Sequence, residues 1–204
     1  MKKNLKIISI IFLILFVILV LAHSLLSTIF LELVMVSGSL YLLWKKDFKE
    51  TVKRMGVGDF WNNTKYTIIG LLSIYFLSIL IYLSLNSFGI NDQNKIVETI
   101  DQLPLYVLLL AIILAPISEE LLFRAYLSKR LIIKGLPYSG ILFSSILFSI
   151  VHISYGSLYE FAGTFVIGIV LASIYYRSKS IVPCVMIHFI YNLISIYAVK
   201  TFVG

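Results

Sequence analysis

The sequence contains few of the charged residues and cysteines that distinguish soluble and secreted proteins. Charged residues make up 13% of its 204 residues, and only 10 residues are acidic, whereas soluble domains average about 25% charged residues. The single cysteine, Cys184, excludes an internal disulfide. Hydrophobic residues make up 60% of the chain, in runs that approach the roughly 20 residues of a membrane-spanning helix. The composition predicts an integral membrane protein.

Seven apolar segments are candidates for membrane-spanning helices. The first follows three lysines and runs to Ala22. It is longer than the about 7 to 15 residues of a signal-peptide core and lacks a small-x-small cleavage pattern, so we expect it to be retained. The other segments are expected at about 25–44, 66–85, 104–133, 138–154, 158–176 and 181–199. The sequence therefore predicts an all-α, polytopic transmembrane helix bundle of about seven spans.

The basic residues alternate between connections, which predicts the orientation in the membrane. Of the 17 Lys and Arg residues, 14 lie at the N-terminus or in connections expected on one side, 45–65, 129–134 and 177–179. The positive-inside rule then predicts a cytoplasmic N-terminus, an acidic external loop at 86–102, and interfacial anchors at Trp61 and Tyr66. The net charge of +7 reflects orientation and contact with the lipid bilayer, so we expect no nucleic-acid partner.

We expect one integral membrane domain with two regions. Residues 1–103 hold the first three spans, and residues 104–204 hold the last four spans and the polar residues considered next. The segment 104–133 would measure about 45 Å as a helix, which is too long for a straight span. We expect Pro116 to kink this segment and to leave nearby carbonyl groups without their helical partners.

Two carboxylates and a guanidinium interrupt this segment, at Glu119, Glu120 and Arg124. Each ionised group costs roughly 2.5 to 3.5 kcal/mol at the centre of a membrane helix, so the three need partners or a water-filled cavity. Glu120 and Arg124 are i,i+4 neighbours and are expected to pair. Glu119 is rotated by about 100° and can face another helix. The pattern predicts a buried polar site.

Three more polar residues interrupt the last spans, namely His152, His188 and Asn192. His188 and Asn192 are four residues apart and share one stripe of a helix. A carboxylate and an imidazole that converge on one water can hydrolyse an amide by general-base catalysis. An amide and a second imidazole can donate to the resulting oxyanion. We therefore expect a hydrolytic site near mid-membrane, in a cavity that opens to the cytoplasm.

Three motifs carry a family resemblance. Glu-Glu-x-x-x-Arg at 119–124, Phe-x-x-x-His at 148–152 and His-x-x-x-Asn at 188–192 resemble, in order and spacing, the motifs of the CPBP family. This is the CAAX prenyl protease type II and bacteriocin-processing group, also called Abi. The stretch from Phe165 to His188 is similar to its third conserved region, with Ala172 where a glycine is expected. The resemblance covers about residues 104–196.

The resemblance implies an intramembrane endopeptidase that cleaves a membrane-associated peptide or protein and needs no cofactor. In the family, the residues matching Glu119 and His152 activate the hydrolytic water, and those matching His188 and Asn192 stabilise the oxyanion. Glu120 and Arg124 would shape and neutralise the site. Frequent Lys, Ile and Asn indicate a bacterium, which predicts a multi-pass protein of the bacterial cell membrane whose substrate is not a prenylated CAAX protein.

Three alternatives use the same residues differently. Two Glu and two His could hold zinc, although the chain lacks His-Glu-x-x-His. Intramembrane Glu, His and Arg also mark transporters and proton relays, but no internal repeat is evident. A non-catalytic bacteriocin immunity or scaffold protein is the third alternative. Outside these motifs, we expect Glu32 to face a helix seam or lipid headgroups, and His23 to lie in an outer turn.

Overall fold

The computed structural model describes residues 30, 33–38, 41, 56, 58–153 and 156–202. The elements within these ranges are helices, and no strand is found among them. The predicted all-α class is therefore confirmed. The first expected span and most of the second, with His23 and Glu32, lie outside the described residues. The count of seven spans and the cytoplasmic N-terminus stay predictions.

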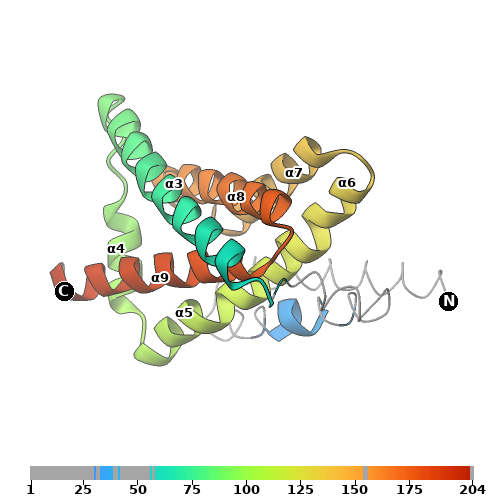
Figure 1. Ribbon diagram of the computed structural model, residues 1–204. Coiled ribbons are helices and arrows are strands. Elements are labelled where there is room, and N and C mark those ends of the chain that lie inside the picture. Colours follow the sequence, from blue (N-terminus) through green and yellow to red (C-terminus); the bar gives the residue numbers. More distant parts are fainter. Residues whose placement is uncertain are drawn as a thin grey trace.

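Five long helical segments form the described bundle (Figure 1). They are α3 (Phe60–Ser87), α5 (Leu105–Glu120) with its continuation, α7 (Pro137–Val151), α8 (Leu158–Ser178) and α9 (Val182–Phe202). The continuation of α5 consists of the π-helix η1 (Leu121–Ser128) and α6 (Lys129–Ile133). Phe60–Ser87, Leu105–Ser128, Leu158–Ser178 and Val182–Phe202 are long and apolar enough to cross a membrane, which supports the predicted membrane location.

The observed boundaries correct the prediction in two places on the N-terminal side of the bundle. Helix α3 begins at Phe60 rather than near residue 66, because the side chain of Asp59 accepts a hydrogen bond from the Asn62 N–H at 3.1 Å and caps the helix. Trp61 therefore lies in the first turn of α3, where its 80% exposure suits an interfacial anchor. The segment 86–102, predicted as a loop, contains the short amphipathic helix α4 (Asn94–Gln102).

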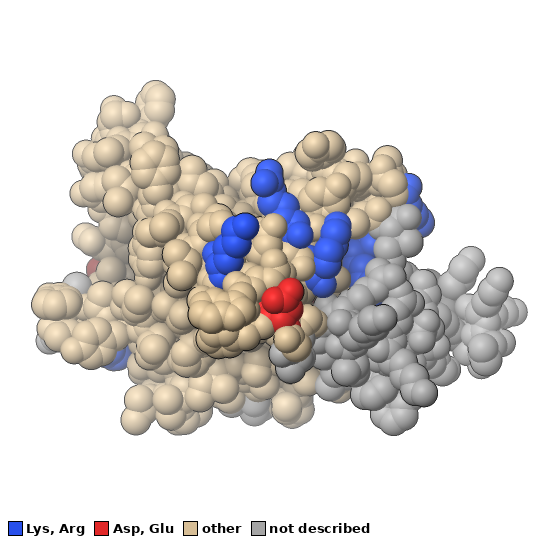
Figure 2. Space-filling model, in the orientation of Figure 1, with Lys and Arg blue, Asp and Glu red and all other residues tan. Residues whose placement is uncertain are grey.

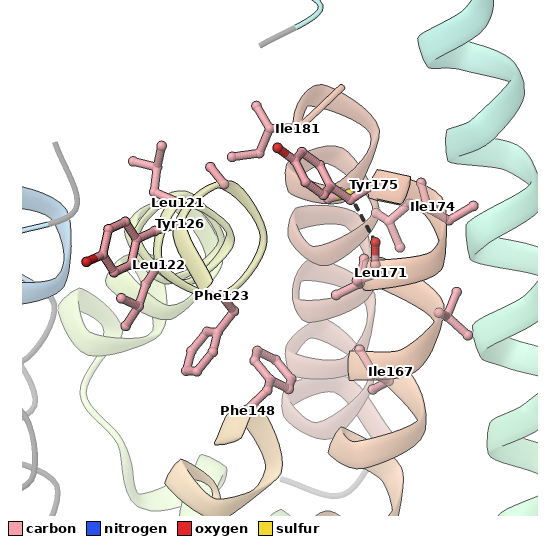
Figure 3. Close-up of a cluster of buried hydrophobic side chains, with 14 of the residues drawn as sticks. Leu121, Leu122, Phe123, Tyr126, Phe148, Ile167, Leu171, Ile174, Tyr175 and Ile181 are labelled. Carbon is pink, nitrogen blue, oxygen red and sulfur yellow. Dashed lines mark hydrogen bonds between the residues drawn. The ribbon is translucent and has the colours of Figure 1, made fainter. Parts of the chain in front are cut away.

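Small residues allow the helices that carry the polar motifs to pack closely. A side chain at Gly168 of α8 would place its Cβ 3.0 Å from the Cα of Ser145 on α7. Thr164 and Ala172, one turn to either side of Gly168, are also buried. This spacing of small residues therefore serves close helix packing. The apolar core next to it joins η1, α7 and α8, with Phe123 against Phe148 (Figure 3).

The two ends of the bundle differ in charge and in how they are closed. At one end, basic side chains gather on the face shown in Figure 2, and the Asn62 amide of α3 donates to the Ser178 carbonyl of α8 at 3.3 Å. At the other end, Lys200 of α9 pairs with Asp101 at 3.1 Å, and Lys95 donates to the Gly156 carbonyl at 2.9 Å. Which end faces the cytoplasm stays a prediction.

Asp92 fastens the connection before α4 to the start of α8. Its carboxylate accepts from the backbone N–H groups of Leu158 at 2.5 Å and Tyr159 at 3.1 Å, and from the Ser157 hydroxyl at 3.1 Å. Burial raises the pKa of the Asp92 carboxyl, but these hydrogen bonds and nearby Lys95 lower it, and the net pKa lies below its usual value. Asp92 thus caps α8 from a distant part of the chain.

We predict that Asp92→Ala lowers the thermal midpoint of the detergent-purified protein by about 2 to 4 °C at pH 7, since a lost helix cap costs about 1 kcal/mol. A lowered pKa means that the stabilisation is present above the unfolded pKa of about 3.9 and is lost as the pH falls through the folded value. The difference between wild type and variant should therefore narrow steadily as the pH falls below about 4. Glu98→Ala, an exposed change on α4, is the control. A difference that stays constant as the pH falls below about 4 would contradict the assignment.

Candidate active site

The helix that carries the paired glutamates changes its hydrogen-bonding pattern directly after them. Pro116 lies inside α5, and the chain continues as the π-helix η1 from Leu121 to Ser128. Single π turns are common at functional sites, where the wider turn redirects side chains. The kink predicted at Pro116 stays a prediction, since α5 continues through Pro116 and the hydrogen-bonding pattern changes only at Leu121. Glu119 ends α5 with Glu120, and both are buried, at 8% and 0% exposure.

Arg124 is the largest fully buried side chain of the cluster and touches three helices. Its Nη1 lies 3.1 Å from Oε1 of Glu120, which confirms the predicted i,i+4 pair. Its Nη2 donates to the Gly168 carbonyl of α8 at 3.5 Å, and its guanidinium carbon lies 4.5 Å from the centre of the Phe148 ring of α7. A carboxylate, a carbonyl and an aromatic face together replace the water that the guanidinium loses.

His188 of α9 lies between the two glutamates. Its Nδ1 is 3.1 Å from Oε1 of Glu120, and its Nε2 is 3.9 Å from Oε2 of Glu119. Because an ionised carboxylate only accepts hydrogen bonds, Nδ1 carries the proton toward Glu120. The imidazole therefore shares Glu120 with Arg124 and turns its second nitrogen toward Glu119. The sequence placed His188 near the carboxylates but did not show that it bridges them.

His152 follows the last residue of α7 rather than lying within a span. Its Nδ1 is 2.8 Å from the carbonyl oxygen of Phe148. A carbonyl only accepts, so Nδ1 is the donor and Nε2 of the neutral ring keeps its lone pair. The Phe148 ring lies next to both imidazoles, with centroid distances of 4.8 Å to His152 and 5.8 Å to His188. The second and third motifs therefore meet around one phenyl ring.

Asn192 lies one turn beyond His188 on α9. Its Nδ2 donates to the carbonyl of Ala111 on α5 at 2.9 Å. The side chain thus joins the two helices that carry the glutamates and His188, and an amide nitrogen retains a second N–H for another acceptor. Sequence reasoning missed the Ala111 carbonyl, because a backbone acceptor leaves no signal in the sequence. Its proposed contact with an oxyanion stays a prediction.

Several buried polar atoms of this cluster have no hydrogen-bond partner among the described residues. They include Oε2 of Glu120, Nε of Arg124 and Oγ of Ser128. Buried polar atoms are normally satisfied, so such atoms identify places where water or a polar ligand is expected. Within the described ranges, no group of three or more His, Cys, Asp and Glu side chains is arranged to hold a metal ion.

Comparison with known proteins finds a family match over the segment that carries this site. Residues 101–194 match the family model described as Rce1-like, type II CAAX prenyl endopeptidase. Comparisons with curated proteins and with solved structures each found no match. The matched segment contains all six site residues, from Glu119 to Asn192, and agrees with the resemblance drawn from the three motifs. Residues 101–194 are thus similar to the Rce1-like, type II CAAX prenyl endopeptidase family, which matches the CPBP resemblance.

Proposed function

We propose that this protein is an intramembrane endopeptidase that hydrolyses a peptide bond of a membrane-associated peptide or protein, with Glu119 as the general base. The observation that carries the proposal is the buried cluster in which His188 lies between Glu119 and Glu120, while Arg124 neutralises Glu120. Burying these ionisable groups in a membrane protein costs free energy, and helix packing by itself does not offset that cost. A hydrolytic role, as in the matched protease family, accounts for their presence.

The formal charges of the cluster balance when one proton is bound. Glu119 and Glu120 contribute two negative charges when ionised, and Arg124 contributes one positive charge. One negative charge therefore remains, which a single proton on Glu119, on His188 or on a water between them would neutralise. A site that needs one proton to become neutral can take it from water during attack and return it later.

The proposed reaction divides the proton transfers between two side chains. Glu119 accepts a proton from water as the water oxygen bonds to the scissile carbonyl carbon and forms a tetrahedral oxyanion. The C–N bond then breaks, the carbonyl re-forms, and the leaving nitrogen takes a proton, leaving a carboxylic acid and an amine. The Nε2 of His152 is suited to relay this proton, because its Nδ1 is held by the Phe148 carbonyl.

Two donors are proposed for the oxyanion. The remaining Nδ2–H of Asn192 is one, with the amide held in place by its bond to Ala111. Nε2 of His188 is the other, and this role requires that the imidazole carry protons on both nitrogens, with Nδ1–H held by Glu120. Preorganised donors of this kind stabilise charge that develops in the transition state.

We predict that Glu119→Gln lowers cleavage of a fluorogenic peptide library by about 10²- to 10⁴-fold, the usual contribution of a general base. The amide keeps the size of the side chain, so the thermal midpoint should change little. Glu98→Gln on the exposed face of α4 is the control and should retain full activity. Undiminished cleavage by Glu119→Gln would refute the assignment, whereas no cleavage by wild type would favour a binding or immunity role.

Asn192→Ala should lower kcat by about 10²- to 10³-fold with little change in KM, because an oxyanion donor acts mainly in the transition state. Asn192→Asp serves as a second variant that preserves the shape but replaces the donor by an acceptor. Steady-state kinetics on the best library peptide would measure both variants. A change confined to KM would assign Asn192 to substrate binding instead.

Arg124→Ala should lower the yield of folded protein rather than its chemistry alone. Breaking a buried ion pair costs about 3 to 5 kcal/mol, because the partner charge remains buried without compensation. The double variant Arg124→Met/Glu120→Gln removes both charges and should recover much of the thermal midpoint without restoring activity. Equal instability of the single and double variants would show that Arg124 stabilises the fold by contacts other than Glu120.

Removal of metal tests the mechanism against its zinc alternative. We expect that cleavage survives incubation with a strong zinc chelator, because the proposed steps use Glu119 and His152 directly. Activity that is lost on chelation and restored by added zinc would instead assign the glutamates and histidines as metal ligands. The Glu119→Gln variant, assayed in parallel, distinguishes specific activity from a contaminating protease.

A further inference from the structure

A second polar cavity lies between α3, α8 and α9, outside the catalytic cluster. Its volume is about 40 Å³, enough for about two or three water molecules. Its lining includes one carboxylate and several hydroxyl groups, from Ser78 of α3, Tyr159, Glu160 and Thr164 of α8, and Tyr191 of α9. Among the described residues of this lining, Glu160 is the one that carries a carboxyl group. The proposed hydrolytic function does not use any of these residues.

The Glu160 side chain can line this cavity because Asp92, rather than Glu160, caps the start of α8. Ser157 and Glu160 have the spacing of a capping box, in which the Glu side chain turns back to the start of the helix. Here only the Ser157 half is present, with Oγ accepting from the Glu160 N–H at 3.2 Å. Asp92 caps the N–H groups of Leu158 and Tyr159 instead, and the Glu160 side chain lines the cavity.

Among the described residues, the lining around Glu160 supplies hydroxyl groups but no basic side chain. The hydroxyl of Thr164 donates to the Glu160 carbonyl at 2.7 Å and keeps its lone pairs for another partner. Tyr191 of α9 and Ser78 of α3 line the same cavity. The lysines described at this end have other partners, since Lys95 donates to the Gly156 carbonyl and Lys200 pairs with Asp101. An ionised carboxylate in such a place requires a positive charge from outside the lining.

We propose that this cavity binds a small monovalent cation, with Na⁺ as the ion of matching size and chemistry. Carboxylate and hydroxyl oxygens are the ligands that hard cations prefer. A single carboxylate suits one positive charge, whereas Ca²⁺ and Mg²⁺ sites commonly use several charged oxygens and more room. The two tyrosines of the lining pack against rings of α3. The ring centroid of Tyr191 lies 5.8 Å from that of Tyr75, and the ring centroid of Tyr159 lies 6.4 Å from that of Tyr82.

Occupation of this cavity would join α3, α8 and α9 through one ion. Each of the three helices contributes an oxygen to the lining, so a bound cation would cross-link them and stabilise the folded state by mass action. Because α9 also carries His188, three residues before Tyr191, the ion would help to fix the helix that completes the catalytic cluster. The binding itself does not depend on the proposed peptidase activity.

The test is the thermal midpoint of the detergent-purified full chain at constant ionic strength, with NaCl replaced stepwise by choline chloride. The wild type should show a saturable rise in midpoint with Na⁺, and the Glu160→Gln variant should show none. Thr164→Val is the second variant, because it removes one hydroxyl of the lining at nearly constant side-chain size while Glu160 remains. It should weaken the response. Glu98→Gln is the matched control and should keep it.

Each other result would overturn the proposal. An equal Na⁺ response in wild type, Glu160→Gln and Thr164→Val would place the ion elsewhere. A second outcome is a wild-type midpoint that does not respond to Na⁺ but depends on pH, with the pH dependence absent in Glu160→Gln. This outcome would mean that the cavity holds a proton and water alone. For that pH arm, the neighbouring titratable groups are Tyr159, Tyr191, Asp92 and Lys95. Uptake of radioactive Na⁺ by equilibrium dialysis provides a direct measure independent of stability.

Discussion

The buried pairing of Glu120 with Arg124 and His188 is the interaction on which the rest of the described structure depends. A carboxylate with 0% exposure needs positive or donating partners from its surroundings. Arg124 comes from the same helix, but His188 comes from α9. The bundle must therefore bring α9 against the η1 segment and keep it there. A membrane helix cannot shift this contact without leaving an ionised group unpaired in an apolar medium.

Close packing at Gly168 extends this constraint to α7 and α8. Arg124 reaches the Gly168 carbonyl of α8, and α8 lies close enough to Ser145 of α7 that a side chain at Gly168 would not fit without movement. The same approach places Phe148 beneath the guanidinium and beside both histidines. Packing and polar contacts thus support each other, and a larger residue at Gly168 would disturb the site without touching it directly.

Acidic residues at the opposite end of the bundle have different structural roles. Asp92 performs the capping that the Ser157–Glu160 spacing assigns to Glu160, while Lys200 and Asp101 join α9 to α4. Contacts between distant segments therefore close this end of the bundle and leave one carboxylate facing an internal cavity. Among the described residues, polar side chains thus gather inside the bundle at the histidine and glutamate cluster and around the Glu160 cavity.

The sequence by itself determined the helical class, the approximate positions of the described spans, the Glu120–Arg124 pair and the set of motif residues. These depend on local spacing, because apolar run length and i,i+4 neighbours are fixed along one helix. It did not reveal α4 or the early start of α3, since a short polar helix and a capping Asp59 leave weak signals.

Only the tertiary structure decided which partners meet across helices. His188 bridges two glutamates, Asn192 turns to the Ala111 carbonyl, and Asp92 displaces Glu160 from its cap. Each outcome depends on helix rotation and on backbone acceptors, which residue spacing within one segment does not encode. The family motifs thus supplied the residues of the site, whereas the packing of α5, α7, α8 and α9 determined the directions in which their hydrogen bonds point.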